Sequence, residues 1–226
     1  MIGSAVGLGN IWRYPYVLYS NGGGAFFIPY IVAILIMGIP FLILEYGVGY
    51  NFKSSFPKAV KSISKKWEYL GWFLPVAVFM ILIYYSAILG WDGFYVIISA
   101  FKGWGADPNA YFTGSFLQAN DTLGGLGTFV PFVAIAMLVG WVIMWVISHT
   151  DLEKGLGRVS KVLVPLLFAI MIFIVLFSLT LPGAGIGLAE LYNPDWSLLL
   201  NFNIWMAAFG QMIFSLSLGM SIAFTY

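Results

Sequence analysis

Hydrophobic residues fill long uninterrupted blocks of this chain, and the few polar positions gather between the blocks. Runs such as FVPFVAIAMLVGWVIMWVI show no alternation with a period of two, which membrane β-strands of about ten residues require. Apolar runs of about 20 residues are long enough to cross a bilayer as helices. They predict helices at approximately residues 1–20, 25–50, 72–101, 128–148, 158–181 and 203–226. The pattern indicates an all-α integral membrane protein with a single, partial transmembrane domain over residues 1–226, whose first and last helices are incomplete.

The composition agrees with this class and argues against several functions. Hydrophobic residues make up 61% of the chain and charged residues 8%, and the net charge is +1, so nothing points to a nucleic-acid partner. The chain has no cysteine and one histidine, His149. No Ser/His/Asp set, metal cluster or pair of carboxylates in one segment can be assembled, so we do not expect an enzyme.

Basic residues mark two of the connections between the expected helices. Of the ten basic residues, five lie in the second connection, and three flank the fourth: Lys53, Lys58, Lys61, Lys65 and Lys66, then Lys154, Arg158 and Lys161. Cytoplasmic loops carry an excess of lysine and arginine. We therefore expect a multi-pass protein of the cell membrane with its N-terminus in the cytoplasm.

The first expected helix is interrupted near its middle. The stretch GSAVGLGNIWRYP places Gly3, Gly7 and Gly9 ahead of Pro15, and each glycine inside a helix costs about 1 kcal/mol relative to alanine. Unpaired backbone groups inside a bilayer cost several kcal/mol each, so a broken helix implies a polar site lined by protein. Close helix packing through Gly3 and Gly7 is the alternative reading.

The sixth expected helix is interrupted as well. In GQMIFSLSLGMS the apolar run is broken by Gln211, Ser215, Ser217, Gly219 and Ser221. Paired interrupted segments at corresponding positions of two repeats are typical of the substrate sites of secondary transporters. In a fold of two inverted five-helix repeats, the first and sixth helices correspond.

Four stretches carry a resemblance to a known family: SAVGLGNIWRYPYVLYSNGGGAFFIPYIVAILIMGIPFLILEYGVG, YYSAILGW, SLTLPGA and GQMIFSLSLGM. They resemble the neurotransmitter:sodium symporters, especially the prokaryotic sodium-coupled amino-acid transporters. The resemblance implies a LeuT-like inverted-repeat fold of twelve helices, with helices 1 and 6 broken at mid-membrane. The chain would then be an N-terminal fragment holding the first repeat and the start of the second, without helices 7 to 12.

The resemblance also implies where ligands bind. The substrate carboxylate would lie on the backbone N–H groups of Leu8 and Gly9, with the Tyr85 hydroxyl as a third donor. Tyr84 and Tyr85 lie about 100° apart on a helix, and the resemblance selects Tyr85. The whole implied substrate site is Ser4, Ala5, Gly7, Leu8, Gly9, Ile81, Tyr85, Phe214, Ser215, Ser217, Gly219 and Met220.

Sodium is the coupling ion that the resemblance implies. A first sodium ion would be bound by Ala5, Asn10 and Ser215, and part of a second site would come from Gly3 and Val6. Tyr30, Gln211 and Ser215 match positions of a chloride site, but chloride dependence stays open.

Further roles follow from the same resemblance. Arg13, Gln211 and Phe214 would form an external gate, and Glu45 would have a structural role, tying helix 2 to the unwound part of helix 6. Gly7 stands where amine-transporting relatives carry an aspartate, which favours a substrate with its own carboxylate. Ile81, Phe214, Ser217 and Met220 match a largely apolar side-chain subsite.

The expected function is therefore sodium-coupled symport of a neutral, hydrophobic or aromatic amino acid by alternating access. A sensor or binding protein that does not transport, or an inactive truncated half-transporter, is the alternative. The expected partners are the amino acid, the lipid bilayer and the absent helices 7 to 12 of the same protein. The sequence leaves the oligomeric state open.

Overall fold

The computed structural model describes residues 7, 9–119, 129–150, 155 and 157–226, and every regular element in them is helical. The chain divides into two compact units, one of Met1–Val76 with Ser160–Tyr226 and the other of Ala77–Val159. Four helical spans in the described residues are long and apolar enough to cross a membrane: Gly23–Phe52, Lys65–Ala100, Pro131–Ser148 and Arg158–Ser178.

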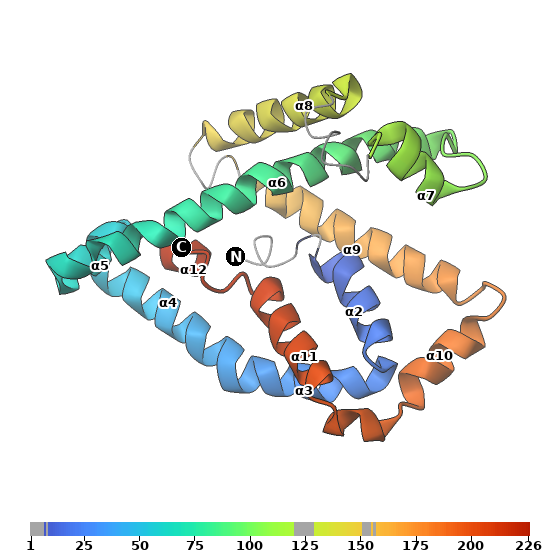
Figure 1. Cartoon of the computed structure of the whole chain (residues 1–226), viewed down its shortest axis with the longest axis horizontal. Helices are drawn as coiled ribbons and strands as arrows, with labels where there is room; N and C mark the ends of the chain where they lie inside the picture. Colours follow the sequence, from blue (N-terminus) through green and yellow to red (C-terminus); the bar gives the residue numbers. More distant parts are fainter. Residues whose placement is uncertain (1–6, 8, 120–128, 151–154, 156) are drawn as a thin grey trace. The chain divides into compact units, whose positions relative to one another are not determined.

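The first unit begins with a short helix that turns back into a long one (Figure 1). Its elements in order are η1 (Gly9–Arg13), α2 (Tyr14–Ser20), η2 (Gly23–Phe26), α3 (Phe27–Ala33), η3 (Ile34–Gly38) and α4 (Ile39–Phe52). Pro15 lies in the first turn of α2, which continues directly from η1 through Arg13 in the right-handed helical conformation. The elements from η2 to α4 form one continuous helical span.

A short amphipathic helix, α5 (Phe56–Ile63), and a 3₁₀ turn, η4 (Lys65–Trp67), connect α4 to α6 (Glu68–Ala100). Lys53 ends α4 in the left-handed conformation, with φ 45°. From Ala77 onward α6 belongs to the second unit. That unit also contains α7 (Pro108–Ala110), η5 (Tyr111–Phe116) and α8 (Pro131–Ser148).

The chain returns to the first unit along α9 (Arg158–Ser178). It continues through α10 (Ala184–Tyr192), η8 (Trp196–Leu200), α11 (Phe202–Ser215) and α12 (Ile222–Thr225). Asp195 caps η8 by accepting a hydrogen bond from the Ser197 backbone N–H at 2.9 Å. Hydrogen bonds from the side chain and backbone of Ser197 lower the pKa of the Asp195 carboxyl.

The core of the first unit forms where α11 packs against the start of the long N-terminal span (Figure 1). One buried cluster joins Ala25 and Phe26 to Ile204 and Ala208. A second cluster consists of Ala33, Met212 and Leu218. The packing therefore brings the N-terminal elements and α11 together, although Ala33 and Met212 are 179 positions apart in the sequence.

Candidate functional site

The helical run that begins with α11 is interrupted between Ser215 and Ile222. Ser217, Gly219 and Ser221 have φ values of 51°, 74° and 57°. Left-handed backbone is unfavourable for residues other than glycine, by roughly 1–2 kcal/mol each, so the surrounding structure has to hold it. The interruption is therefore stabilised by the tertiary structure around it, and it lies within the expected sixth helix.

Glu45 of α4 contacts the interrupted backbone between α11 and α12. Its Oε1 accepts a hydrogen bond from the Gly219 backbone N–H at 2.6 Å, across 174 positions of sequence. Its Oε2 and the Ser221 hydroxyl are buried without a hydrogen-bond partner in the described part of the chain. A hydrogen bond to an ionised acceptor is stronger than one between neutral groups. Glu45 thus fixes α4 to the non-helical backbone between α11 and α12.

Gln211 connects the two segments that the sequence marks as interrupted. Its side chain is fully buried in α11. Its Nε2 donates to the Gly9 carbonyl at 3.2 Å and to the Ser215 hydroxyl at 3.1 Å. Its Oε1 accepts a hydrogen bond from Nη1 of Arg13. One amide therefore satisfies polar groups on η1 and on the last turn of α11.

Phe214 covers the start of η1 beside this network. The Arg13 guanidinium carbon lies 5.3 Å from the centroid of the Phe214 ring, close enough for a cation–π interaction. A Cβ atom on Gly9 would overlap the same ring. Glycine at position 9 leaves room for the Phe214 ring, which would have to move if Gly9 carried a side chain.

The structure places the other expected site residues as follows. Asn10 lies in η1, and its backbone N–H donates to the Gly7 carbonyl at 3.0 Å. Tyr30 of α3 packs its ring against Tyr14 at 5.0 Å and Phe26 at 6.0 Å between ring centroids. Ser217, Gly219 and Met220 lie in the break.

Seven expected site residues lie either in the second unit or outside the described residues. Ile81 and Tyr85 lie on the part of α6 that belongs to the second unit. Five others, Gly3, Ser4, Ala5, Val6 and Leu8, lie outside the described residues. The roles expected for both groups stay predictions.

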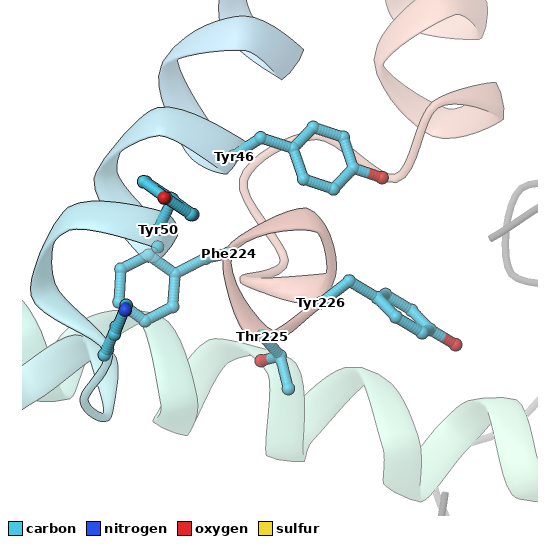
Figure 2. Close-up of a pocket in the computed structure, with 7 residues that line it drawn as sticks. Tyr46, Tyr50, Phe224, Thr225 and Tyr226 are labelled. Carbon is cyan, nitrogen blue, oxygen red and sulfur yellow. The ribbon is translucent and has the colours of Figure 1, made fainter. Parts of the chain in front are cut away.

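Sequence reasoning missed the packing between α4 and α12. A cavity of about 420 Å³ opens there, lined by Tyr46, Gly49, Tyr50, Lys53, Phe224, Thr225 and Tyr226. Figure 2 shows Tyr46 and Tyr50 extending from α4, and Phe224, Thr225 and Tyr226 from the segment of α12. A Cβ on Gly49 would collide with the Phe224 backbone, so the two helices approach closely at this glycine. The glycines in EYGVGY are the sequence signal for such a contact.

Comparison with known proteins decides the family. The model of the sodium:neurotransmitter symporter family matches residues 1–106 and 100–226. The chain belongs to this family. It is therefore a multi-pass membrane protein that forms about half of the helical LeuT-like fold of these symporters.

Individual relatives support the same assignment. This symporter-family chain is 43% identical over its whole length to an uncharacterised sodium-dependent transporter of Methanocaldococcus jannaschii, of which it covers 46%. It is 34% identical over 99% of its length to an uncharacterised sodium-dependent transporter of Bacillus subtilis, covering 48% of that protein. A sodium-dependent neutral amino acid transporter of Rattus norvegicus is 31% identical over 99% of the chain, with 40% of the rat protein covered. The chain thus spans about half the length of the curated relatives it matches.

Proposed function

We propose that this chain supplies substrate-binding and sodium-binding segments of a symporter for a neutral, hydrophobic or aromatic amino acid. The observation that carries the proposal is the Gln211 network, which joins η1 to the last turn before the break. The archaeal and bacterial relatives are sodium-dependent transporters, and the rat relative is a sodium-dependent neutral amino acid transporter. A sensor that binds without transport has no observation in its favour.

The proposed chemistry uses the ends of interrupted helices. Helix N-termini carry a partial positive charge and C-termini a partial negative charge, so a carboxylate and a sodium ion can bind side by side. We assign the carboxylate to the Leu8 and Gly9 N–H groups and the Tyr85 hydroxyl. The first sodium ion is assigned to Ala5, Asn10 and Ser215.

Further ligands complete this proposal. Gly3 and Val6 contribute carbonyl oxygens to a second sodium ion, since hard cations prefer oxygen ligands. Sodium next to the carboxylate offsets part of the cost of placing that charge in the membrane. Each ligand then raises the affinity of the other by the same factor, which is the thermodynamic basis of coupling.

The substrate class rests on the side chains around the break. Gly7 provides no carboxylate that could receive an amine, so the substrate has to bring its own acid. Ile81, Phe214, Ser217 and Met220 are assigned to the side-chain subsite, together with Gly219 and the Ser4 backbone. Methionine adapts its shape readily, which suits large apolar or aromatic amino acids.

Closure toward the outside is assigned to Arg13, Gln211 and Phe214. Their contacts hold η1 against α11 on one side of the break. Alternating access requires that these contacts open and close around a fixed site. Tyr30, Gln211 and Ser215 are the candidate chloride ligands, and sodium-driven uptake in chloride-free gluconate medium decides whether chloride participates.

Removal of the Asn10 side chain tests the sodium assignment. We expect Asn10→Ala, in the protein expressed from its whole reading frame, to raise the sodium concentration for half-maximal amino-acid uptake about tenfold. The physical reason is the loss of one amide oxygen ligand, comparable to a hydrogen bond to a charged group. Uptake of labelled leucine, phenylalanine and tryptophan into proteoliposomes at varied external sodium measures this.

The matched control for this experiment is Asn51→Ala. Asn51 is an exposed asparagine on α4, whose side chain donates to the Gly47 carbonyl at 2.8 Å. It should leave the sodium dependence unchanged. Equal sodium affinities in Asn10→Ala and the parent would remove Asn10 from the site, and uptake that needs no sodium would refute the proposed function.

Two adjacent tyrosines on α6 allow a similarly matched test of carboxylate recognition. We expect Tyr85→Phe to weaken amino-acid binding about tenfold because one donor to the carboxylate is lost. Tyr84→Phe removes the same hydroxyl from a side chain about 100° away around the helix and should bind normally. Scintillation proximity with labelled amino acid measures both, and an equal effect of the two changes would contradict the assignment.

A further inference from the structure

The connection between α4 and α6 carries most of the positive charge of the first unit. All five of its lysines are exposed: Lys53, Lys58, Lys61, Lys65 and Lys66. Lys61 forms an ion pair with Glu68 at 2.9 Å. For the other four, the described residues provide no carboxylate within ion-pair distance. The connection therefore presents uncompensated positive charge to its surroundings.

These lysines lie on a fixed platform. Pro57 and Ala59 are buried on the inner side of α5, and a Cβ on Gly71 of α6 would meet the Pro57 Cα at 2.7 Å. The Phe56 ring packs edge-on against Phe224 of α12, with centroids 5.5 Å apart and an interplanar angle of 88°. Close contacts with α6 and α12 thus hold α5 in place.

The same connection lies at the end of two membrane-length spans. One span ends at Phe52 and the next begins at Lys65, so α5 connects two membrane-length helices. Ile63, Trp67 and Tyr69 are 71%, 52% and 63% exposed. Aromatic side chains favour the membrane–water interface. Because the inner side of α5 packs against α6, the exposed side of α5 that meets its surroundings is the basic one.

We propose that α5 and η4 form a binding surface for anionic phospholipid headgroups, contacted by Lys53, Lys58, Lys65 and Lys66. The phosphate of the headgroup supplies the complementary charge, and clustered lysines next to a membrane span attract anionic lipid additively. Lipid bound here stabilises α5, and α5 contacts α12 through Phe56. This inference does not depend on the proposed transport activity.

Lipid competition tests the surface directly. The protein is purified in a neutral detergent, and the bound phosphatidylglycerol and phosphatidylcholine are counted by native mass spectrometry at low ionic strength. We expect Lys58→Gln/Lys65→Gln/Lys66→Gln to lower the preference for phosphatidylglycerol at least tenfold. Each lysine near the membrane surface contributes at most about a fivefold preference, and three are removed. High salt should reduce the preference of the parent, because exposed charges are screened.

Two matched triple variants make the result specific. Lys102→Gln/Arg158→Gln/Lys161→Gln removes the same charge from scattered positions at the ends of other spans and should lower the preference much less. Lys58→Arg/Lys65→Arg/Lys66→Arg keeps the charge and should retain the preference. Circular dichroism confirms that each variant keeps its helix content. An equal loss in both glutamine variants, or no loss in either, would overturn the proposal. Displacement of the lipid by inorganic phosphate would assign the surface to a soluble anion and would overturn it too.

Discussion

Replacement of Gln211 by leucine is expected to lower the free energy of unfolding by about 3 to 5 kcal/mol. Leucine has a similar volume but cannot form hydrogen bonds, so the Gly9 carbonyl, the Ser215 hydroxyl and the Arg13 guanidinium all lose a partner. Each buried polar group left unpaired costs about 1–3 kcal/mol, and charged groups cost more. Chemical unfolding in mixed detergent–lipid micelles measures the loss.

Gln211→Glu is the informative companion to this change. A glutamate keeps an acceptor for Arg13 and adds a complementary charge, while it gives up the two donated hydrogen bonds. We expect Gln211→Glu to lower the free energy of unfolding by about half as much as Gln211→Leu does. The bond that it keeps, to the Arg13 guanidinium, would join two charged groups and would therefore be the strongest of the three hydrogen bonds made at this position. Equal stability of the leucine variant and the parent would show that the network contributes nothing.

The second large effect is expected from Glu45→Leu, at about 3 kcal/mol. The change removes the acceptor for the Gly219 N–H and frees the backbone between α11 and α12. Because hydrogen bonds to charged groups contribute about 1.5–3 kcal/mol, local opening should become roughly a hundredfold more frequent. Hydrogen exchange of a peptide covering residues 216–221, followed by mass spectrometry, measures that opening.

Glu45→Gln separates geometry from charge at this position. Its carbonyl oxygen can still accept from Gly219, so slow exchange in residues 216–221 should be largely restored. Exchange in Glu45→Gln as fast as in Glu45→Leu would mean that the negative charge, rather than the acceptor, holds the break. Unchanged exchange in both variants would show that Glu45 does not stabilise the break at all.

Much of the helical architecture could be predicted because bilayer thickness imposes it on the sequence. The expected helix at 25–50 corresponds to the span Gly23–Phe52, and the one at 72–101 to α6. The start of α6 at Glu68 was missed because its first turn contains polar and aromatic residues, which a helix outside the hydrocarbon tolerates. The π-helical turn Ile34–Gly38 was missed as well. It depends on packing, because Gly38 lies against Met212 and Leu216.

The site was less accessible to sequence reasoning alone. Glycine and serine patterns indicated two interruptions, but periodicity does not identify which side chain on one segment meets which group on another. The resemblance suggested that Arg13 and Gln211 are neighbours and that Glu45 contacts the unwound segment. Neither the resemblance nor the hydrophobic pattern indicated that Gly49 lies against the Phe224 backbone or that the Phe56 ring contacts the Phe224 ring. Both contacts join residues far apart in the sequence, and only the tertiary fold brings them together.

The hydrogen bond between Arg13 and Gln211 also constrains how the protein is made. The two residues are 198 positions apart, and synthesis adds about 5–20 residues per second. Roughly 10 to 40 seconds therefore pass between the synthesis of Arg13 and the synthesis of its acceptor. An arginine near the centre of a membrane helix costs about 2.5–3.5 kcal/mol during insertion. The first helix is thus expected to remain next to the insertion machinery or in the headgroup region until α11 arrives, and to settle in the membrane as one of the last helices of its unit.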